Sequence, residues 1–184
     1  MLIPIVTLLV VIAILYGISL YTRILAKRSR TANAWGQVDN QLKHRHDLIR
    51  SLIVIVREEL QQDNQVLEAA TRARLDAIET GSDIPRRGEA ESELSQATKR
   101  LLALIEGYPN LKNSFHVRAL QNDLTTTEAR IAEANVEYAR CAHDYNPMLA
   151  GPLGRIYADR FQWHPAADFR LDATSELVSP WVLR

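Results

Sequence analysis

Several residue types on which whole protein classes depend are scarce in this sequence. Its 184 residues include one Cys, seven Gly and seven Pro. A single Cys excludes a disulfide framework, a zinc ribbon and an iron–sulfur site, and so few Gly and Pro exclude collagenous and low-complexity chains. The 22 Lys and Arg balance the 22 Asp and Glu, which leaves no net charge to attract nucleic acid. We therefore expect no nucleic-acid partner.

Charged side chains are absent before Arg23. The run from Leu2 to Tyr21 is apolar, and about 20 helical residues cross a hydrocarbon core of roughly 30 Å. A secretory signal peptide needs a basic region before its apolar centre and a small-residue cleavage site, and the run has neither. We therefore predict an uncleaved transmembrane anchor at residues 1–22. The residues expected to form or flank this anchor are Leu2, Ile5, Leu8, Val11, Leu15, Tyr16, Tyr21, Arg23, Lys27, Arg28 and Arg30.

The cations that follow the apolar run predict its orientation. Arg23, Lys27, Arg28 and Arg30 follow it and no Lys or Arg precedes it, so the positive-inside rule places the C-terminal side in the cytoplasm. We expect a single-pass protein of the bacterial inner membrane with its N-terminus outside and the lipid bilayer as a partner. The four cations are either a plain stop-transfer flank or contacts for anionic headgroups.

The rest of the chain has the periodicity of helices. Apolar residues recur at steps of three and four over about residues 23–62 and 112–146, with two shorter patterns between them, and period-two alternation is nowhere sustained. The expected fold is all-α, with the first long helix continuous with the transmembrane helix. An antiparallel bundle of about four helices, two long and two shorter, then occupies residues 23–149. Residues 80–88 are predicted to be a loop in which Arg86 and Arg87 aid solubility.

Residues 150–184 form an aromatic, Pro-punctuated tail. A short helix is expected near Leu153 to Phe161. So many aromatic residues are untypical of a solvated linker, so the tail either docks on the bundle or is presented to a partner. The aromatic residues concerned are Tyr157, Phe161, Trp163, Phe169 and Trp181.

No catalytic, metal or cofactor site is recognisable in the sequence. His44 and His46 lie two residues apart, so they diverge on a helix and are expected to be solvated. Cys141 and His143 also diverge, and Cys141 is expected to be a small buried residue. No Gly-rich phosphate loop, Gly-x-Ser-x-Gly or His-Glu-x-x-His motif occurs. We therefore expect a protein that is not an enzyme and binds no cofactor.

Two blocks of sequence resemble the signatures of the LemA family. The first is NAWGQVDNQLKHRHDLI at residues 33–49, and the second is EGYPNLKNSFHVRALQNDLTTTEARIAEANVEYARCAHDYN at residues 106–146. The resemblance covers roughly residues 23–146. It implies one membrane anchor with a small outward N-terminus, a cytoplasmic antiparallel helical bundle, and no established enzymatic activity. It also implies association with membrane proteases or TPM-domain proteins.

The matched polar and aromatic residues lie on both long helices. One reading is that they pair between helices and fix the register, because polar residues on a buried seam are costly unless paired. The other reading is a shared surface for a partner. The residues concerned are Trp35, Asp39, Arg45, Asp47, Tyr108, Lys112, Gln121, Glu128, Tyr138 and Tyr145.

Two functional hypotheses follow. The first is a membrane-tethered, non-enzymatic scaffold that forms homo-oligomers or gathers partners and organises or remodels the membrane, because tethering raises effective concentration. The alternative is a regulatory adaptor that recruits a membrane protease or sensor through its C-terminal tail.

Overall fold

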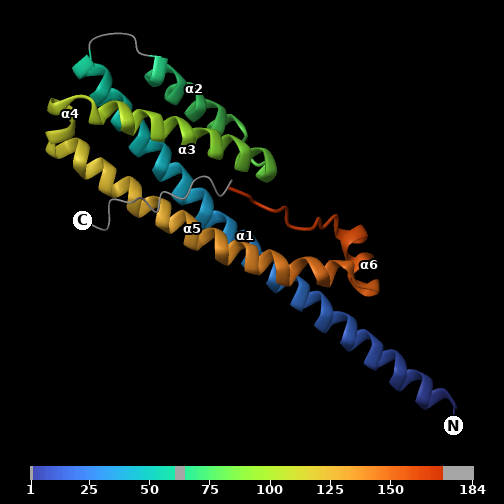
Figure 1. The fold of residues 1–184 in the computed structure, drawn as a ribbon. Helices are drawn as coiled ribbons and strands as arrows, with labels where there is room; N and C mark the ends of the chain where they lie inside the picture. The colour runs from blue at the N-terminus through green and yellow to red at the C-terminus, as the bar shows by residue number, and fades with distance from the viewer. Residues whose placement is uncertain (1, 61–64, 172–184) are drawn as a thin grey trace. The chain divides into compact units, whose positions relative to one another are not determined.

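The computed structural model describes residues 2–60 and 65–171, and for residues 2 and 3 the backbone alone. These residues form helices and no strand, which confirms the all-α prediction. Figure 1 shows the helices along the chain. They are α1 (Leu2–Leu60), α2 (Gln65–Glu79), α3 (Ile84–Glu106), α4 (Pro109–Asn113), α5 (Phe115–Ala150) and α6 (Pro152–Phe161). The predicted continuity between the apolar run and the first long helix is confirmed in α1, and the short helix expected near residues 153–161 is α6.

The predicted loop at residues 80–88 is wrong after residue 83. Helix α3 begins at Ile84 because Asp83 caps it, the Asp83 side chain accepting a hydrogen bond from the Arg86 backbone N–H at 3.3 Å. Pro85 lies in the first turn, where its missing N–H costs nothing and its fixed φ suits a helix. Arg86 and Arg87 therefore belong to a helix.

Helix α5 also continues past its expected end at residue 146. Pro147 lies inside it, one turn before the helix ends at Ala150. A Pro at this position removes one backbone hydrogen bond. The neighbours Tyr145 and Leu149 are 2% and 6% exposed, so their burial favours the helical path despite that loss.

The chain forms two compact units, and each takes part of α1 and part of α5. Of the described residues, unit 1 contains those within 1–36 and 136–166, and unit 2 contains those within 37–135 and 167–184. In unit 1 the two long helices are antiparallel. Lys27 pairs with Asp144, Thr31 donates a hydrogen bond to the Cys141 carbonyl, and the rings of Trp35 and Tyr138 lie 5.2 Å apart.

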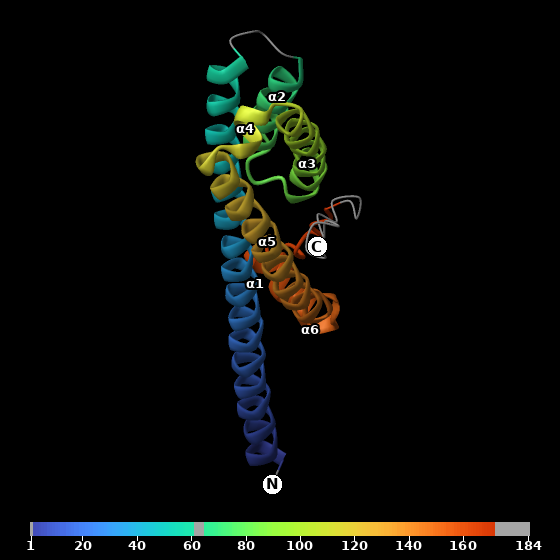
Figure 2. The same cartoon turned by 60° about the vertical axis from the view of Figure 1, so that its left-hand side comes forward.

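Unit 2 has a core to which five helices contribute. Helices α2 and α3 lie side by side in both views (Figures 1 and 2). The fully or nearly buried apolar side chains of this core include Ile49, Leu52 and Val56 of α1, Leu67 of α2, Leu94, Leu101 and Ile105 of α3, Leu111 of α4, and Val117 and Leu124 of α5. In α1, α3 and α5 these residues recur at spacings of three, four and seven, which produces one apolar stripe on each of these helices, as burial against neighbouring helices requires.

Candidate functional site

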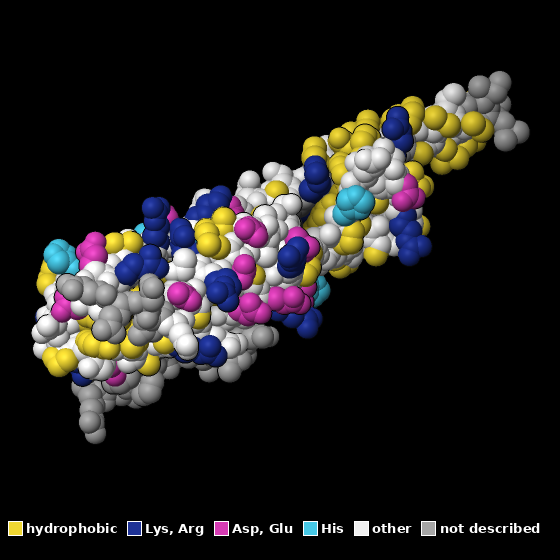
Figure 3. Space-filling view, turned by 90° about the horizontal axis from the view of Figure 1, so that it is seen from above, with side chains coloured by type: hydrophobic (Ala, Val, Ile, Leu, Met, Phe, Trp, Pro, Cys, Tyr) yellow, Lys and Arg dark blue, Asp and Glu magenta, His cyan; other side chains and the backbone are white. Residues whose placement is uncertain are grey.

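The N-terminal part of α1 is apolar and uncovered. The large hydrophobic side chains from Ile5 to Ile18 are 51% to 61% exposed. Figure 3 shows them as an almost continuous hydrophobic surface along this end of the helix. The predicted anchor residues Ile5, Leu8, Val11, Leu15 and Tyr16 all belong to this surface, whereas the side chain of Leu2 lies outside the described part. Among the described residues, α1 alone is long and apolar enough to cross a membrane.

The predicted flanking cations follow directly. Arg23, Arg28 and Arg30 are exposed, and Lys27 is half-buried. The Lys27 ammonium pairs with the Asp144 carboxylate of α5. That hydrogen bond and the charge of Lys27 lower the pKa of Asp144 below its ordinary value.

Aromatic side chains gather where the apolar run ends. The Tyr21 ring centroid lies 5.9 Å from that of Tyr157, 5.4 Å from Phe161 and 5.6 Å from Trp163. Gln162 ends α6 in the left-handed conformation, and the Trp163 N–H then donates to the Ala158 carbonyl at 3.0 Å. This turn folds Trp163 back beside α6. We call Tyr21, Tyr157, Phe161 and Trp163 the aromatic cluster.

Farther along the tail, contacts continue within each unit. In unit 1 the Asn146 side chain both donates to and accepts from the backbone of Ala166. In unit 2 Phe169 is buried, and a Cβ on Gly88 would lie 2.4 Å from the Arg170 carbonyl oxygen. Residues up to 171 of the tail are therefore packed in several places, while Trp181 lies outside the described residues.

A buried group of charges lies in unit 2. The guanidinium of Arg45 in α1 is 1% exposed and pairs with Glu91 of α3 and with Glu128 of α5, the second contact being 2.9 Å. Arg45 also donates to the Ser95 hydroxyl at 3.1 Å. Burial opposes a charged arginine, but the two carboxylates outweigh it and raise the pKa of Arg45. This pairing joins three helices through one side chain.

Glu91 holds the centre of this group. Its side chain is fully buried, and its Oε1 lies 2.9 Å from His46 Nε2. Because the carboxylate already accepts from Arg45, the imidazole nitrogen facing it is a donor. Burial favours the neutral acid, but the His46 hydrogen bond and the Arg45 charge prevail and lower the pKa of Glu91. We call Arg45, His46, Glu91, Ser95 and Glu128 the buried ion cluster.

A second pairing extends this cluster. Arg87 of α3 lies 2.6 Å from Asp39 of α1, and Asp39 also pairs with Lys43 at 2.7 Å. Partial burial of Asp39 opposes its ionisation, but Lys43 and Arg87 lower its pKa below the ordinary value. The Arg87 Nε lies 3.8 Å from Glu91, which brings the two groups of charges together.

Three expectations from the sequence are wrong here. His46 is 3% exposed rather than solvated, because its ring is needed as a donor to Glu91. Arg87 is 7% exposed rather than a solubilising residue, because α3 starts early enough to turn it towards Asp39. Cys141 is only partly buried, since its thiol lies beside Glu137 near the solvated face of α5.

The other residues predicted to set the register are distributed unevenly. Tyr138 and Tyr145 are buried in unit 1, and Gln121 is partly buried in unit 2. Asp47 and Lys112 are exposed and, within the described residues, form no ion pair. Tyr108 is 40% exposed and stands at the N-cap of the short helix α4.

Glu91 and Ser95 were missed by the sequence reasoning, although a signal was present. Glu91 lies three residues before Leu94 on the buried stripe of α3, and Arg87 lies one turn earlier. Charged residues that continue an apolar stripe indicate partners on the facing helix.

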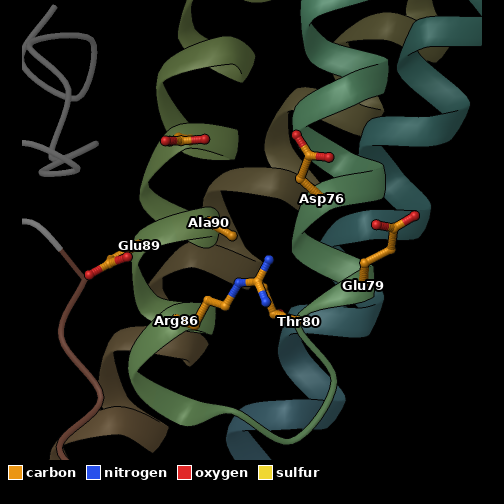
Figure 4. A pocket seen from close by; sticks show the side chains of 7 residues that line it. Asp76, Glu79, Thr80, Arg86, Glu89 and Ala90 are labelled. Carbon is orange, nitrogen blue, oxygen red and sulfur yellow. The ribbon is translucent and has the colours of Figure 1, made fainter.

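A shallow hollow lies between α2 and α3 (Figure 4). Asp76 and Glu79 line it from α2, Glu89 and Glu93 line it from α3, and the Arg86 side chain reaches into it. These four acidic residues and Arg86 form its charged lining. Among the described residues, no group of three or more His, Cys, Asp or Glu side chains is placed to hold a metal ion.

The charged side chains of the buried ion cluster pair with one another. Each carboxylate in it accepts from a cation or an imidazole, and the arrangement therefore fixes helix positions rather than presenting a free base. Burial and, to a smaller extent, the neighbouring Glu137 raise the pKa of the Cys141 thiol, which disfavours the reactive thiolate.

Comparison with known proteins identifies the family. No curated protein matches the sequence. The family model described as LemA family matches residues 34–182. The match extends beyond the two blocks, which end at residue 146, and takes in most of the tail. Asp39, Arg45, Glu91 and Glu128, which hold α1, α3 and α5 together, all fall within it. Because the matched residues make up most of its length, the chain belongs to the LemA family.

Proposed function

We propose that this protein is a non-enzymatic scaffold tethered to the bacterial inner membrane by one transmembrane helix. The observation that carries the proposal is the uncovered apolar surface of α1, with side chains 51% to 61% exposed from Ile5 to Ile18. Soluble proteins rarely expose an apolar area of this extent, since each buried Å² of apolar surface is worth about 25 cal/mol. A bilayer covers such a helix without requiring any polar group.

The proposed orientation rests on the cations after this surface. Arg23, Arg28 and Arg30 are exposed, and together with Lys27 they favour a cytoplasmic C-terminal side. The N-terminus would then face outward. The helices after residue 22 would form an antiparallel bundle whose register is set by the buried ion cluster and by Asp39 with Arg87.

Self-association is the proposed activity of the tethered domain. Large apolar side chains outside the anchor are exposed in unit 2, among them Phe115 at 75% and Leu75 at 49%. Confinement to a membrane plane raises the effective concentration, so weak contacts between such residues suffice to assemble many copies. Such an assembly would organise or remodel the membrane, or gather partners such as a membrane protease or a TPM-domain protein.

The alternative is an adaptor that recruits a protease or sensor through its tail. The described part of the tail supports it less, because Trp163 and Phe169 are 8% and 4% exposed and so already packed within the chain. Deleting residues 150–184 from the full protein separates the two ideas. Assembly that survives while partner capture is lost would favour the adaptor.

Anchoring and orientation can be tested with one cysteine. In a Cys141→Ala background, His116→Cys places a thiol on the exposed start of α5. A membrane-impermeant maleimide should label it in inverted inner-membrane vesicles and leave it unlabelled in intact spheroplasts. Labelling from outside, or recovery of the protein free of membrane after alkaline extraction, would overturn the proposal.

Self-association needs its own measurement. The full chain, labelled at His116→Cys with donor or acceptor dyes, is reconstituted at constant total protein while the lipid content is increased. Energy transfer should fall as copies are diluted in the plane. The double variant Phe115→Ser, Leu75→Ser should lower energy transfer, whereas Arg50→Ala, at an exposed site on α1, should not. Energy transfer no greater than random distribution predicts would contradict the scaffold.

A further inference from the structure

The tail returns to the end of the proposed anchor. The Tyr157 hydroxyl of α6 donates a hydrogen bond to the Gly17 carbonyl of α1 at 2.9 Å. Gly17 lies six residues before Arg23, the first charged residue, which is about 9 Å along a helix axis. Helix α6 is therefore level with the last two turns of the apolar run.

Gly17 permits this approach. A Cβ at this position would lie 3.2 Å from the Tyr157 hydroxyl oxygen, which is tighter than ordinary van der Waals contact. Ile24, one turn beyond Leu20, is fully buried in a cluster that includes Tyr157 and Trp163. The apolar run is thus exposed up to Ile18 and then covered on one side by α6.

This position sets the depth of α6 in a bilayer. Charged side chains are costly in hydrocarbon, so the inner boundary of the hydrocarbon lies near Tyr21, before Arg23. Tyrosine and tryptophan favour that boundary, and the aromatic cluster lies there around Tyr21. A helix at this level cannot avoid the headgroup region.

The outer side of α6 suits that region. Leu153 and Ile156, one turn apart, are 41% and 62% exposed, and Phe161 is 46% exposed. Arg155 and Arg160 are exposed on the same short helix. An apolar stripe next to arginines is the pattern of a helix that lies in the membrane interface.

Resting on the membrane anchoring proposed above, we infer that α6 and the aromatic cluster form a second membrane-binding element in the cytoplasmic leaflet. Leu153, Ile156 and Phe161 enter the boundary between headgroups and acyl chains. Arg155 and Arg160, together with Arg28 beside the Trp163 ring at 5.8 Å, contact anionic headgroups. The occupant of the exposed α6 surface is the lipid itself.

Depth-dependent quenching tests this inference on the full chain. In a Cys141→Ala background, an environment-sensitive dye is placed by Ile156→Cys on α6, by Ile12→Cys in the anchor, or by Val136→Cys on α5. The matched control Val136 is 70% exposed in the same unit, and Ile156 is 62% exposed. The protein is reconstituted in phosphatidylcholine vesicles with or without phosphatidylglycerol, with nitroxide lipids as quenchers.

The expected result separates the three sites. The dye at Ile156 should be quenched strongly by a nitroxide near the headgroup and weakly by aqueous iodide. The dye at Val136 should be quenched weakly by that nitroxide and strongly by iodide. Phosphatidylglycerol should increase lipid quenching at Ile156, and Arg155→Gln with Arg160→Gln should reduce that increase, because Arg28 remains. The dye at Ile12 should be quenched by a nitroxide deep in the acyl chains.

Two outcomes would overturn the inference, and a third would overturn the anchoring proposal. Iodide quenching at Ile156 equal to that at Val136 would overturn the inference while Ile12 still reports the anchor. Protection of Ile156 from both quenchers would mean that protein covers α6, which also overturns it. Absence of lipid quenching at Ile12 would defeat the anchoring proposal itself.

Discussion

Arg45 and Glu91 face each other from α1 and α3, with exposed side-chain fractions of 1% and 0%. A charge removed from water this completely costs several kcal/mol unless its partner remains. Their mutual pairing, shared with Glu128 and His46, therefore makes the arrangement of helices in unit 2 sensitive to any single loss.

Replacing Arg45 should be severely destabilising. Arg45→Met leaves Glu91 buried without its nearest cation, and breaking a buried pair in this way costs about 3–5 kcal/mol. Arg50→Ala, on the exposed face of the same helix, should change the free energy of unfolding by less than about 0.5 kcal/mol. Denaturant unfolding of the detergent-solubilised full chain, followed by circular dichroism, measures both.

If Arg45→Met does not fold, its free energy of unfolding cannot be measured. A second variant, in which the charges are removed together, is therefore compared with it. Arg45→Met combined with Glu91→Gln and Glu128→Gln removes the charges together and leaves His46 an acceptor, and removal of a buried ion group as a whole is often neutral or stabilising. Recovery of most of the lost stability is expected. Equal damage in the single and the triple variant would show that charge pairing is not the cause.

Acid should destabilise unit 2 through Glu91. Its folded pKa is lowered, because His46 and Arg45 outweigh the effect of burial, so the folded state binds the proton less readily than the unfolded state. The stabilisation is therefore complete above the unfolded pKa of about 4.3 and is lost as the pH falls through the folded pKa. Glu91→Gln should be less stable than the parent at neutral pH, and the gap should narrow in acid. A gap that is constant with pH would refute this.

Gly154 should not tolerate a methyl group. A Cβ there would lie 1.9 Å from the Met148 carbonyl oxygen, a backbone atom that cannot move aside cheaply. Gly154→Ala should cost about 1–3 kcal/mol or displace α6. Gly36→Ala is the matched control, because nothing lies within 4 Å of its Cβ and α1 gains about 0.5–1 kcal/mol from the better helix former. If the contact is real, thermal unfolding should show a lower melting temperature for Gly154→Ala and a higher one for Gly36→Ala than for the parent.

The start of α3 depends on Asp83. Asp83→Ala removes the acceptor for the Arg86 backbone N–H and should cost about 1 kcal/mol, whereas Asp83→Asn should keep most of the stability. Hydrogen exchange at the first turn of α3 localises the effect. Unchanged exchange in the alanine variant would show that Pro85 alone determines the start of the helix.

Periodicity predicted the helices well because each must bury one stripe. The apolar run, the long helix continuous with it and α6 followed from residue types and spacing alone. Arg45 on an otherwise apolar seam predicted a buried pairing, and its contact with Glu128 joins two residues of the matched blocks. Glu91 was missed although it continues the buried stripe of α3; its spacing indicates a partner on a facing helix but does not identify Arg45 or His46.

Helix ends and tail contacts were less predictable for a similar reason. A proline usually marks the end of a helix, yet α5 continues past Pro147 because Tyr145 and Leu149 on either side of it are buried. The bond from Tyr157 to Gly17 joins residues 140 positions apart, and no local pattern encodes such a pairing. Long-range contacts of single side chains are decided by packing rather than by propensity.

The buried ion cluster also limits how this sequence can drift over time. Arg45 pairs with two carboxylates, and one of these also accepts from His46, so an exchange of Arg45 or Glu91 alone leaves an interior charge without a partner that it needs. Neutral intermediates are scarce, and the effects of such exchanges are not additive. Descendants of this chain should therefore keep these positions together or replace several of them in concert.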